Sequence, residues 1–328
     1  MHNRKYCWQR DRQRGGRCMR KVDPSRIIID TDIGGDPDDA TAITLAAVSP
    51  ELYIEGITTV YSDVRYHARR VAKLLKLAGI RPIPIYYELS QSLLRNREIG
   101  WITEADTEDD GGDGDMLDGG PTPASAGHAV EFIIRTIMEN PGEITLIGIG
   151  PLTNIAAAII MEPRLISHVK EIVLMGGVIR LGSNGADLQP IEYNIQCDPE
   201  AASVVFSSGG PIVMVGLDVT SKVMITREHC KRLIASVKPS NIALADVIER
   251  WLVRIGENTT AMHDPLAVAV VLDRSLVTTL RMSVEVGYDH RNGTGQTIAR
   301  SDPAGSVDVC IDVDAPRFLE LLFGRLCE

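Results

Sequence analysis

The sequence predicts an α/β fold with a mainly parallel central sheet and helices on both of its faces. Strand-like and helix-like segments alternate along the chain from residue 26 onward. The strand-like segments are short, continuous apolar runs, which is typical of parallel strands buried on both faces. No internal repeat or linker divides the chain after residue 22. These observations indicate a three-layer, Rossmann-like sandwich that forms a single large domain.

The first part of the chain supplies three strands and two helices of this pattern. A β-branched run at 26–30 indicates a strand, and the apolar segment 38–48 indicates a largely buried helix. Apolar residues recur at helical spacing in 65–78, and Gly79 marks the end of that helix. Further strands are expected at 51–60 and 82–86.

The alternation resumes at residue 128 and continues toward the C-terminus. Late strands are expected near 277–288 and 307–313, within a portion that is otherwise more helical. In parallel sheets of this kind, ligands bind beyond the carboxyl ends of the strands. The remaining expected elements are helices 128–139, 152–161 and 199–207 and strands 144–149, 171–175 and 211–215.

Composition excludes several classes of protein. Of the 328 residues, 44% are hydrophobic and 24% are charged, which is ordinary for a globular enzyme and unlike a disordered or fibrous chain. No run approaches the roughly 18 apolar residues of a membrane helix, so no membrane partner is expected. The formal charge of −10 argues against general affinity for nucleic acid. Six scattered cysteines without a CxxC pair indicate reduced thiols and a cytoplasmic location.

The charge is unevenly distributed. Residues 1–22 carry a net charge of +7, and the rest of the chain carries −17. The basic segment lacks the apolar core of a secretory signal, and its composition predicts a disordered arm that precedes a domain spanning 23–328. A transit peptide or an arm for an anionic partner is the alternative. A second biased stretch, 103–120, holds eight acids and five glycines, and is either a solvated loop or an active-site lid.

The turn after the first strand is strongly acidic. DTDIGGDPDDA, from Asp30 to Ala40, places five carboxylates within ten positions. Like charges so close together raise one another's pKa unless a cation compensates them. Two of the acids could simply favour the N-terminus of the next helix, but that does not account for five. Carboxylate oxygens suit Ca²⁺ or Mg²⁺, so the turn predicts a metal site.

Four motifs, in order, resemble those of the inosine-uridine preferring nucleoside hydrolases. They are the acidic turn, LIGIGPLTNIA (146–156), LMGG (174–177) with EYNIQCDPEAA (192–202), and HDPLAVA (263–269). The resemblance extends from Arg26 to about Val313. It implies a ribonucleoside N-glycohydrolase that binds Ca²⁺ and assembles as a homodimer or homotetramer.

The resemblance also implies roles for individual residues. The Ca²⁺ ligands would be Asp32, Asp39, Asp264 and the backbone carbonyl of Ile149, and Asp32 would also be the base that activates the bound water. His263 would protonate or contact the leaving base. The substrate would be held by Asp38, which accepts from a ribose hydroxyl, and by Glu192, Asn194, Asp63 and Met175.

Three further residues are assigned structural roles. Asn154 and Asp198 are expected to order the backbone at helix starts, because each comes just before or at the start of a helical run. Trp251 is expected to pack in the core rather than to stack on a nucleobase. The other six histidines are likewise interpreted as structural.

The chain also departs from the family pattern. Asp63 stands where the family commonly has Asn, and Ala186 where several members carry a sugar-contacting Asn. The acidic stretch 103–120 replaces a loop that often brings a further His to the base. In the acidic turn, two additional residues place the paired acids at Asp38 and Asp39, and Asp36 is expected to point to solvent or to the rim of the site. These departures leave the preference between purines and pyrimidines open.

Two other functions compete with nucleoside hydrolysis. Asp30 and Asp32 fit the DxD pair of Mg²⁺-dependent phosphatases of the haloacid-dehalogenase type, although the residues that follow depart from that motif. A non-catalytic protein of the same fold that binds a ribosyl group or calcium is the second alternative.

Overall fold

The computed structural model describes residues 23–94, 115–123, 125–180, 188, 190–289 and 293–328. The basic segment 1–22, Ala186 and most of the acidic stretch 103–120 lie outside these residues, as do the predictions made for them. Within the described ranges, no helix has the length and apolarity needed to cross a membrane.

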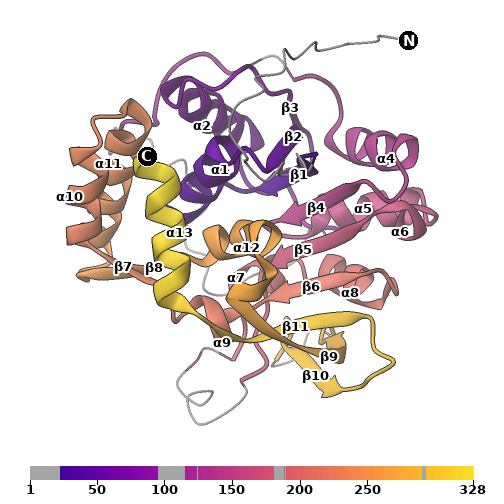
Figure 1. The fold of residues 1–328 in the computed structure, drawn as a ribbon. Helices are drawn as coiled ribbons and strands as arrows, with labels where there is room; N and C mark the ends of the chain where they lie inside the picture. The colour runs from indigo at the N-terminus through magenta and orange to yellow at the C-terminus, as the bar shows by residue number, and fades with distance from the viewer. Residues whose placement is uncertain (1–22, 95–114, 124, 181–187, 189, 290–292) are drawn as a thin grey trace, which may run out of the picture.

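A nine-stranded sheet forms the centre of the molecule (Figure 1). Its strand order is β10-β9-β11-β6-β5-β4-β1-β2-β3, and the seven strands from β11 to β3 are parallel. At the other edge, β9 is antiparallel to both of its neighbours. The strands are β1 (Ser25–Thr31), β2 (Leu52–Thr59), β3 (Ile85–Tyr87), β4 (Ile144–Gly148), β5 (Glu171–Met175), β6 (Ile212–Val215), β9 (Val277–Val286), β10 (Thr297–Ser301) and β11 (Val307–Val313).

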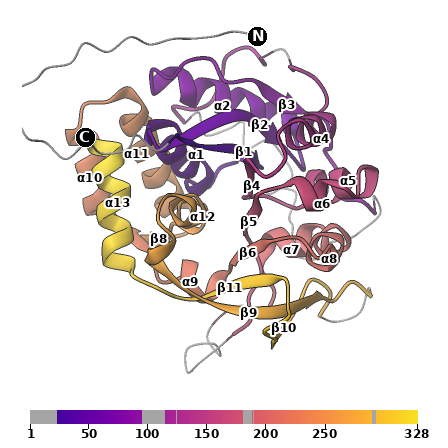
Figure 2. The same cartoon turned by 45° about the vertical axis from the view of Figure 1, so that its right-hand side comes forward.

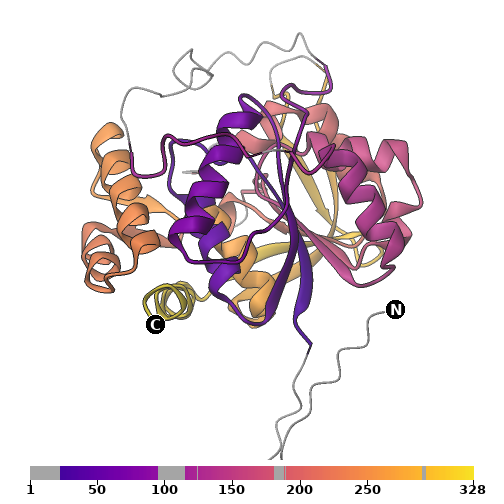
Figure 3. The ribbon, with the colours of Figure 1, turned by 90° about the horizontal axis from the view of Figure 1, so that it is seen from above.

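Alternating side chains of the sheet enter two separate cores. In β1, Ile27 and Ile29 belong to one core and Ile28 to the other. Figures 2 and 3 show a layer of helices on each side of the sheet. The first layer holds α1 (Asp38–Val48), α2 (Val64–Leu77), α12 (His263–Leu272) and α13 (Ala315–Cys327), and the second holds α4 (Ala129–Glu139), α5 (Thr153–Met161), α6 (Leu165–His168) and α8 (Pro199–Ser207). Helices α10 (Arg227–Ala235) and α11 (Pro239–Arg254) pack on the outside of the first layer, against α13 and α2.

Shorter elements complete the fold. Strands β7 (Met224–Thr226) and β8 (Thr259–Ala261) pair as a separate antiparallel sheet. Two short helices, α7 (Tyr193–Cys197) and α9 (Leu217–Thr220), follow strands β5 and β6, and a 3₁₀ turn, η1 (Arg274–Leu276), precedes β9. The predicted α/β fold with a mainly parallel sheet is thus confirmed, with an antiparallel edge added.

The strand order determines where a ligand is expected to bind. From β1 the chain moves outward to β2 and β3, and it then returns to place β4 on the other side of β1. The loops after β1 and β4 therefore part in opposite directions, which opens a crevice at the carboxyl edge of the sheet. The acidic turn follows β1 directly, and Ile149 follows β4.

Candidate active site and metal centre

A cavity of about 770 Å³ opens at this edge of the sheet. Its walls come from the turns after β1, β2, β4 and β5 and from α7, α9, α11 and α12. All ten residues that the sequence nominates for the site line it, although they come from motifs as much as 232 positions apart. They are Asp32, Asp38, Asp39, Asp63, Ile149, Met175, Glu192, Asn194, His263 and Asp264.

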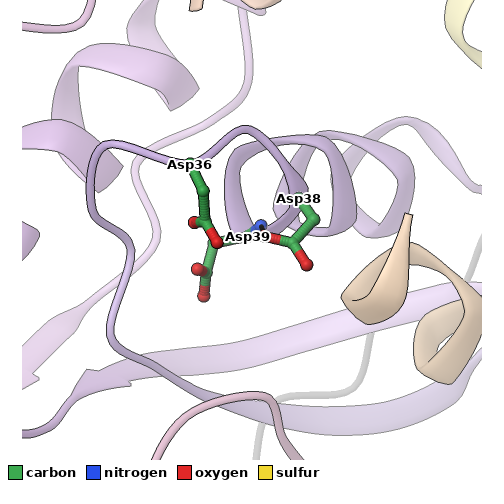
Figure 4. Close-up of side chains that lie close together, drawn as sticks. All are labelled: Asp36, Asp38 and Asp39. Carbon is green, nitrogen blue, oxygen red and sulfur yellow. Dashed lines mark hydrogen bonds between the residues drawn. The ribbon is translucent and has the colours of Figure 1, made fainter. Parts of the chain in front are cut away.

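Three carboxylates of the acidic turn form a group that could hold a metal ion. One oxygen from each of Asp36, Asp38 and Asp39 lies within 4.8 Å of the others (Figure 4). Helix α1 begins at Asp38, and the hydroxyl of Thr31 donates to the Asp39 carboxylate. The end of β1 and the first turn of α1 therefore fix the position of Asp39.

Asp36, expected to point to solvent or to the rim of the site, is half-buried in the cavity lining. Its carboxylate turns toward those of Asp38 and Asp39 rather than toward solvent (Figure 4). The backbone accounts for this, because Pro37 already has helical dihedral angles and its carbonyl accepts from both the N–H and the hydroxyl of Thr41. The turn therefore folds back over the start of α1 and brings Asp36 inward.

Burial and, to a lesser extent, mutual repulsion raise the pKa of these acids. Burial and the charge of Asp32 raise the pKa of Asp38 to about 6. Burial also raises the pKa of Asp39, and the neighbouring carboxylates of Asp32, Asp38 and Asp36 raise it further. The pKa of Asp264 is raised by burial and by the same group of acids. A bound divalent cation would compensate these charges, and carboxylate oxygens are the ligands that Ca²⁺ and Mg²⁺ prefer.

Asp32 and Asp264 line the cavity but do not belong to the group of three. Asp32 is half-buried at the end of β1, and its pKa is raised by burial and by Asp36. Gly150 packs against it so closely that a Cβ atom there would lie 2.7 Å from Asp32 Oδ1. The residue after Ile149 must therefore lack a side chain for Asp32 to occupy this position.

Glu192 and Asn194 are held by backbone groups. Glu192 caps α7, and its carboxylate accepts from the N–H groups of Gly177, Asn194 and Ile195 at 2.8–3.0 Å. The Asn194 amide nitrogen lies 3.2 Å from the carbonyl oxygen of Met175 and 3.4 Å from that of Ile149. These contacts join the ends of β4 and β5 to α7 and fix both side chains in the cavity wall.

His263 begins α12 and is positioned by a threonine. Its Nδ1 lies 2.8 Å from Thr220 Oγ1, and burial lowers its pKa, against the opposing effect of Asp36. Trp251 also lines the cavity, so the expectation that it packs in the core is not met. Its indole N–H donates to Thr260 Oγ1 at 3.1 Å, which leaves the ring on the wall.

The helix-start expectation holds for Asp198 and is wrong for Asn154. Asp198 caps α8 by accepting from Ala201 N–H. Asn154 already lies within the first turn of α5, and its amide nitrogen donates to the Asp30 carboxylate at 2.8 Å and to the carbonyl of Thr59 at 3.2 Å. It therefore joins β1 to β2 instead of capping a helix.

Tyr61, Tyr193 and His67 are among the lining residues that were not nominated from the sequence. Tyr61 and Tyr193 both interact with the buried Cys197, and each has a raised pKa because of burial and the nearby Cys197 and Asp32. His67 also lines the cavity, although it was interpreted as structural. A tyrosine just after a strand and a histidine in an amphipathic helix carry no distinctive pattern, so only the packing of the loops reveals them.

Comparison with known proteins identifies the family of this chain. The model of the family described as inosine-uridine preferring nucleoside hydrolase matches residues 27–320. A pyrimidine-specific ribonucleoside hydrolase, RihA, of Citrobacter koseri is 33% identical over 314 residues, which cover 92% of this chain and 97% of that protein. The pyrimidine-specific hydrolase RihB of Escherichia coli is 32% identical over 304 residues, covering 89% of this chain and 95% of that protein.

A solved structure agrees with these sequence matches. The purine-preferring ribonucleoside hydrolase from Gardnerella vaginalis superposes with a TM-score of 0.79 at 31% identity, covering 92% of this chain and 98% of that one. The predicted resemblance is therefore confirmed, and the family match spans residues 27–320. The chain belongs to the inosine-uridine preferring nucleoside hydrolase family and is an N-glycosyl hydrolase by that membership.

Proposed function

We propose that the protein is a Ca²⁺-dependent hydrolase that cleaves the N-glycosidic bond of ribonucleosides to free base and ribose. The proposal rests on one observation: the acidic turn, the Glu192–Asn194 motif and the His263–Asp264 motif all line the same cavity. The relatives support it through their names, which include both pyrimidine-specific and purine-preferring ribonucleoside hydrolases.

The acidic side of the cavity would hold the ion. Asp32, Asp39, Asp264 and the carbonyl oxygen of Ile149 are the proposed ligands, with Asp36 close beside them. When bound, Ca²⁺ would supply positive charge that makes water more acidic and that holds ribose hydroxyls. The raised pKa values of the carboxyl groups are consistent with a site in which these charges are compensated by a cation.

Asp32 is the proposed general base. Its carboxylate lines the cavity beside the other proposed ligands, where it could accept a proton from water held at the ion. On the other side of the cavity, His263 is the proposed proton donor to the leaving base. When its Nδ1 accepts from the Thr220 hydroxyl, Nε2 carries the N–H of the neutral ring and can donate a hydrogen bond to the leaving base, whereas full proton transfer requires the imidazolium form.

The polar side chains between these groups would recognise the sugar. Asp38, Glu192 and Asn194 are buried and line the cavity. A site built to pair with ribose hydroxyls rejects a deoxy analogue strongly, because one buried polar group is then left without a partner. We therefore propose ribonucleosides, rather than deoxyribonucleosides, as the substrate class. We further propose a cytoplasmic homodimer or homotetramer, on the family resemblance and the reduced cysteines.

One assay separates this function from its competitors. The purified protein is incubated with inosine, with uridine and with a sugar phosphate in the presence of CaCl₂ or MgCl₂, and both reducing sugar and inorganic phosphate are measured. Release of reducing sugar from a nucleoside supports the proposal. Release of phosphate alone would indicate a phosphatase, and release of neither product would indicate a binding protein.

A further inference from the structure

His67 lies between two turns that carry residues of the cavity. It is buried in the first turn of α2, and its ring lines the cavity. Its Nδ1 is 2.6 Å from the carbonyl oxygen of Ile33 in the acidic turn. Its Nε2 is 3.1 Å from the carbonyl oxygen of Tyr61 in the turn after β2. Each ring nitrogen therefore faces a backbone carbonyl of a different turn.

The ring is placed to donate to these two carbonyls, to one of them when it is neutral and to both only when it carries two protons. Within the described part of the chain, no backbone N–H donates to either of them. A buried carbonyl without a donor destabilises the conformation that buries it. The second turn is also strained, because Tyr61 and Ser62 have φ angles of 63° and 51°, a region that non-glycine residues occupy only when their surroundings hold them there.

We propose that His67 is a positioning residue that joins the acidic turn to the turn formed by Tyr61, Ser62 and Asp63. Ile33 follows Asp32 directly, so a bond to its carbonyl fixes the backbone that carries the proposed base. The contact of Nε2 with the Tyr61 carbonyl holds the facing wall of the cavity against the same ring. His67 thereby sets the separation between Asp32 and that wall, acting through the two backbones. This inference rests on the function proposed above.

The test variants differ in the hydrogen-bond donors that they place at position 67. His67→Phe keeps a planar ring but removes both ring nitrogens, and with them every N–H donor of this side chain. His67→Gln retains donors at one end only, and His67→Arg presents N–H donors on several sides with no acceptor. As a matched control, His229→Phe removes a half-buried histidine at the start of α10, where it contacts Thr226 and stacks on Phe323, outside the cavity lining.

Steady-state kinetics on inosine and uridine, at saturating CaCl₂ and corrected for the folded fraction, test the proposal. We expect His67→Phe to lower kcat/KM by about 10–100-fold, mainly through kcat, because small displacements of a catalytic group have effects of this size. The kcat/KM of His67→Gln should lie between those of the wild type and His67→Phe, and His67→Arg should recover most of the lost kcat/KM. His229→Phe should keep the wild-type kcat/KM. If His67→Phe only lowers Tm and its folded fraction retains wild-type kcat/KM, the proposal is wrong.

Hydrogen exchange provides a readout that does not need activity. In His67→Phe we expect faster amide exchange in peptides that cover both 33–39 and 60–64, with recovery in His67→Arg and no change in His229→Phe. Unchanged exchange in both segments would overturn the inference. If the wild-type protein releases no base from any ribonucleoside but this exchange pattern is observed, the proposed function fails while the joining role of His67 stands.

Discussion

Asp32 is the residue on which the proposed chemistry depends most. It is half-buried beside Gly150, with Asp36, Asp30 and Glu192 all raising its pKa. We predict that Asp32→Asn lowers kcat by at least roughly 10²–10⁴-fold, the usual contribution of a general base. The fold should survive, because the substitution removes one of several repelling charges. Turnover on inosine and uridine and Tm are the measurements, and near-normal turnover on both would exclude Asp32 from the mechanism.

The three clustered acids should differ in their effect on Ca²⁺ binding. Asp39 is buried and fixed by the Thr31 hydroxyl, so we predict that Asp39→Ala removes most Ca²⁺ affinity. Asp36 is half-buried, and His263 and Arg70 partly offset its charge, so Asp36→Ala should weaken binding only modestly. Asp38→Ala should mainly raise KM for ribosides. Calorimetric Ca²⁺ titration measures the three variants, and loss of binding in Asp36→Ala but not in Asp39→Ala would contradict the assigned register.

Single residues were predictable from the sequence where they belong to motifs. Asp32, Asp38 and Asp39 of the acidic turn and the His263–Asp264 pair were nominated, and all of them line the cavity. Asn154 was assigned the wrong structural role, because its hydrogen-bond partners Asp30 and Thr59 lie on strands that are distant in sequence. Contacts of this kind depend on strand pairing, which local sequence patterns do not encode.

At the scale of elements, prediction succeeded where a segment has its own periodicity or cap. Helix α1 begins at Asp38 and ends at Val48, as predicted from the acidic pair and the apolar run that follows. Strand β3 begins at Ile85 rather than residue 82, because Pro82 and Pro84 cannot donate to a neighbouring strand. The three-residue strands β7 and β8 were not predicted, since segments so short have no periodic pattern.

The packing of α2 against the segment 115–118 depends on one buried cation. Arg70 is only 1% exposed, and its guanidinium binds the carboxylates of Asp115 and Asp118 at 2.8 Å. Removing one partner of a buried ion pair leaves uncompensated charge, so we predict that Arg70→Ala lowers the free energy of unfolding by about 3–5 kcal/mol. The matched variant is Arg69→Ala, whose half-buried side chain makes a long hydrogen bond to Thr122.

Arg69→Ala should change the free energy of unfolding little, in keeping with most surface substitutions. Urea denaturation followed by circular dichroism compares the two variants. Equal losses of stability in both would show that the paired carboxylates do not depend on Arg70. Arg70→Lys should recover only part of the loss, because an ammonium cannot bind two carboxylates in the fixed geometry of a guanidinium.

For the whole molecule, the sequence predicted the layers and the main run of parallel strands. It did so because buried parallel strands are continuously apolar and alternate with helices. The antiparallel edge was harder to predict from the sequence, because β10 is a half-exposed strand of five residues with few apolar side chains. The cavity itself follows from the strand order, which brings together loops that are distant in sequence.

The concentration of acids should make stability depend on pH and on Ca²⁺. The pKa is raised to about 7 in Asp30 and about 6 in Asp38, and it is also raised in Asp32, Asp36, Asp39 and Asp264. Between the unfolded and folded pKa values, the folded chain binds more protons than the unfolded chain. The free energy of unfolding of the metal-free protein should therefore fall as the pH rises from about 4 toward 7.

Two histidines oppose this trend. The pKa values of His67 and His263 are lowered by burial, which favours stability at higher pH, but the raised carboxyl groups are more numerous. We predict that in EDTA Tm falls by several degrees between pH 5 and pH 8, and that saturating CaCl₂ removes this fall. Thermal scans over this range measure it. A Tm in EDTA that rises with pH would contradict the electrostatic account of the site.

The most direct test of the central claim is the identity of the products in a phosphate-free buffer. Wild-type protein with CaCl₂ is incubated with inosine or uridine, and free base and ribose are quantified together by NMR. We predict that base and ribose appear in equal amounts, that 2′-deoxyribonucleosides react far more slowly, and that Asp32→Asn forms neither product at a comparable rate. If cleavage requires added phosphate and yields a sugar phosphate, or if the wild-type protein releases no base, the account is wrong.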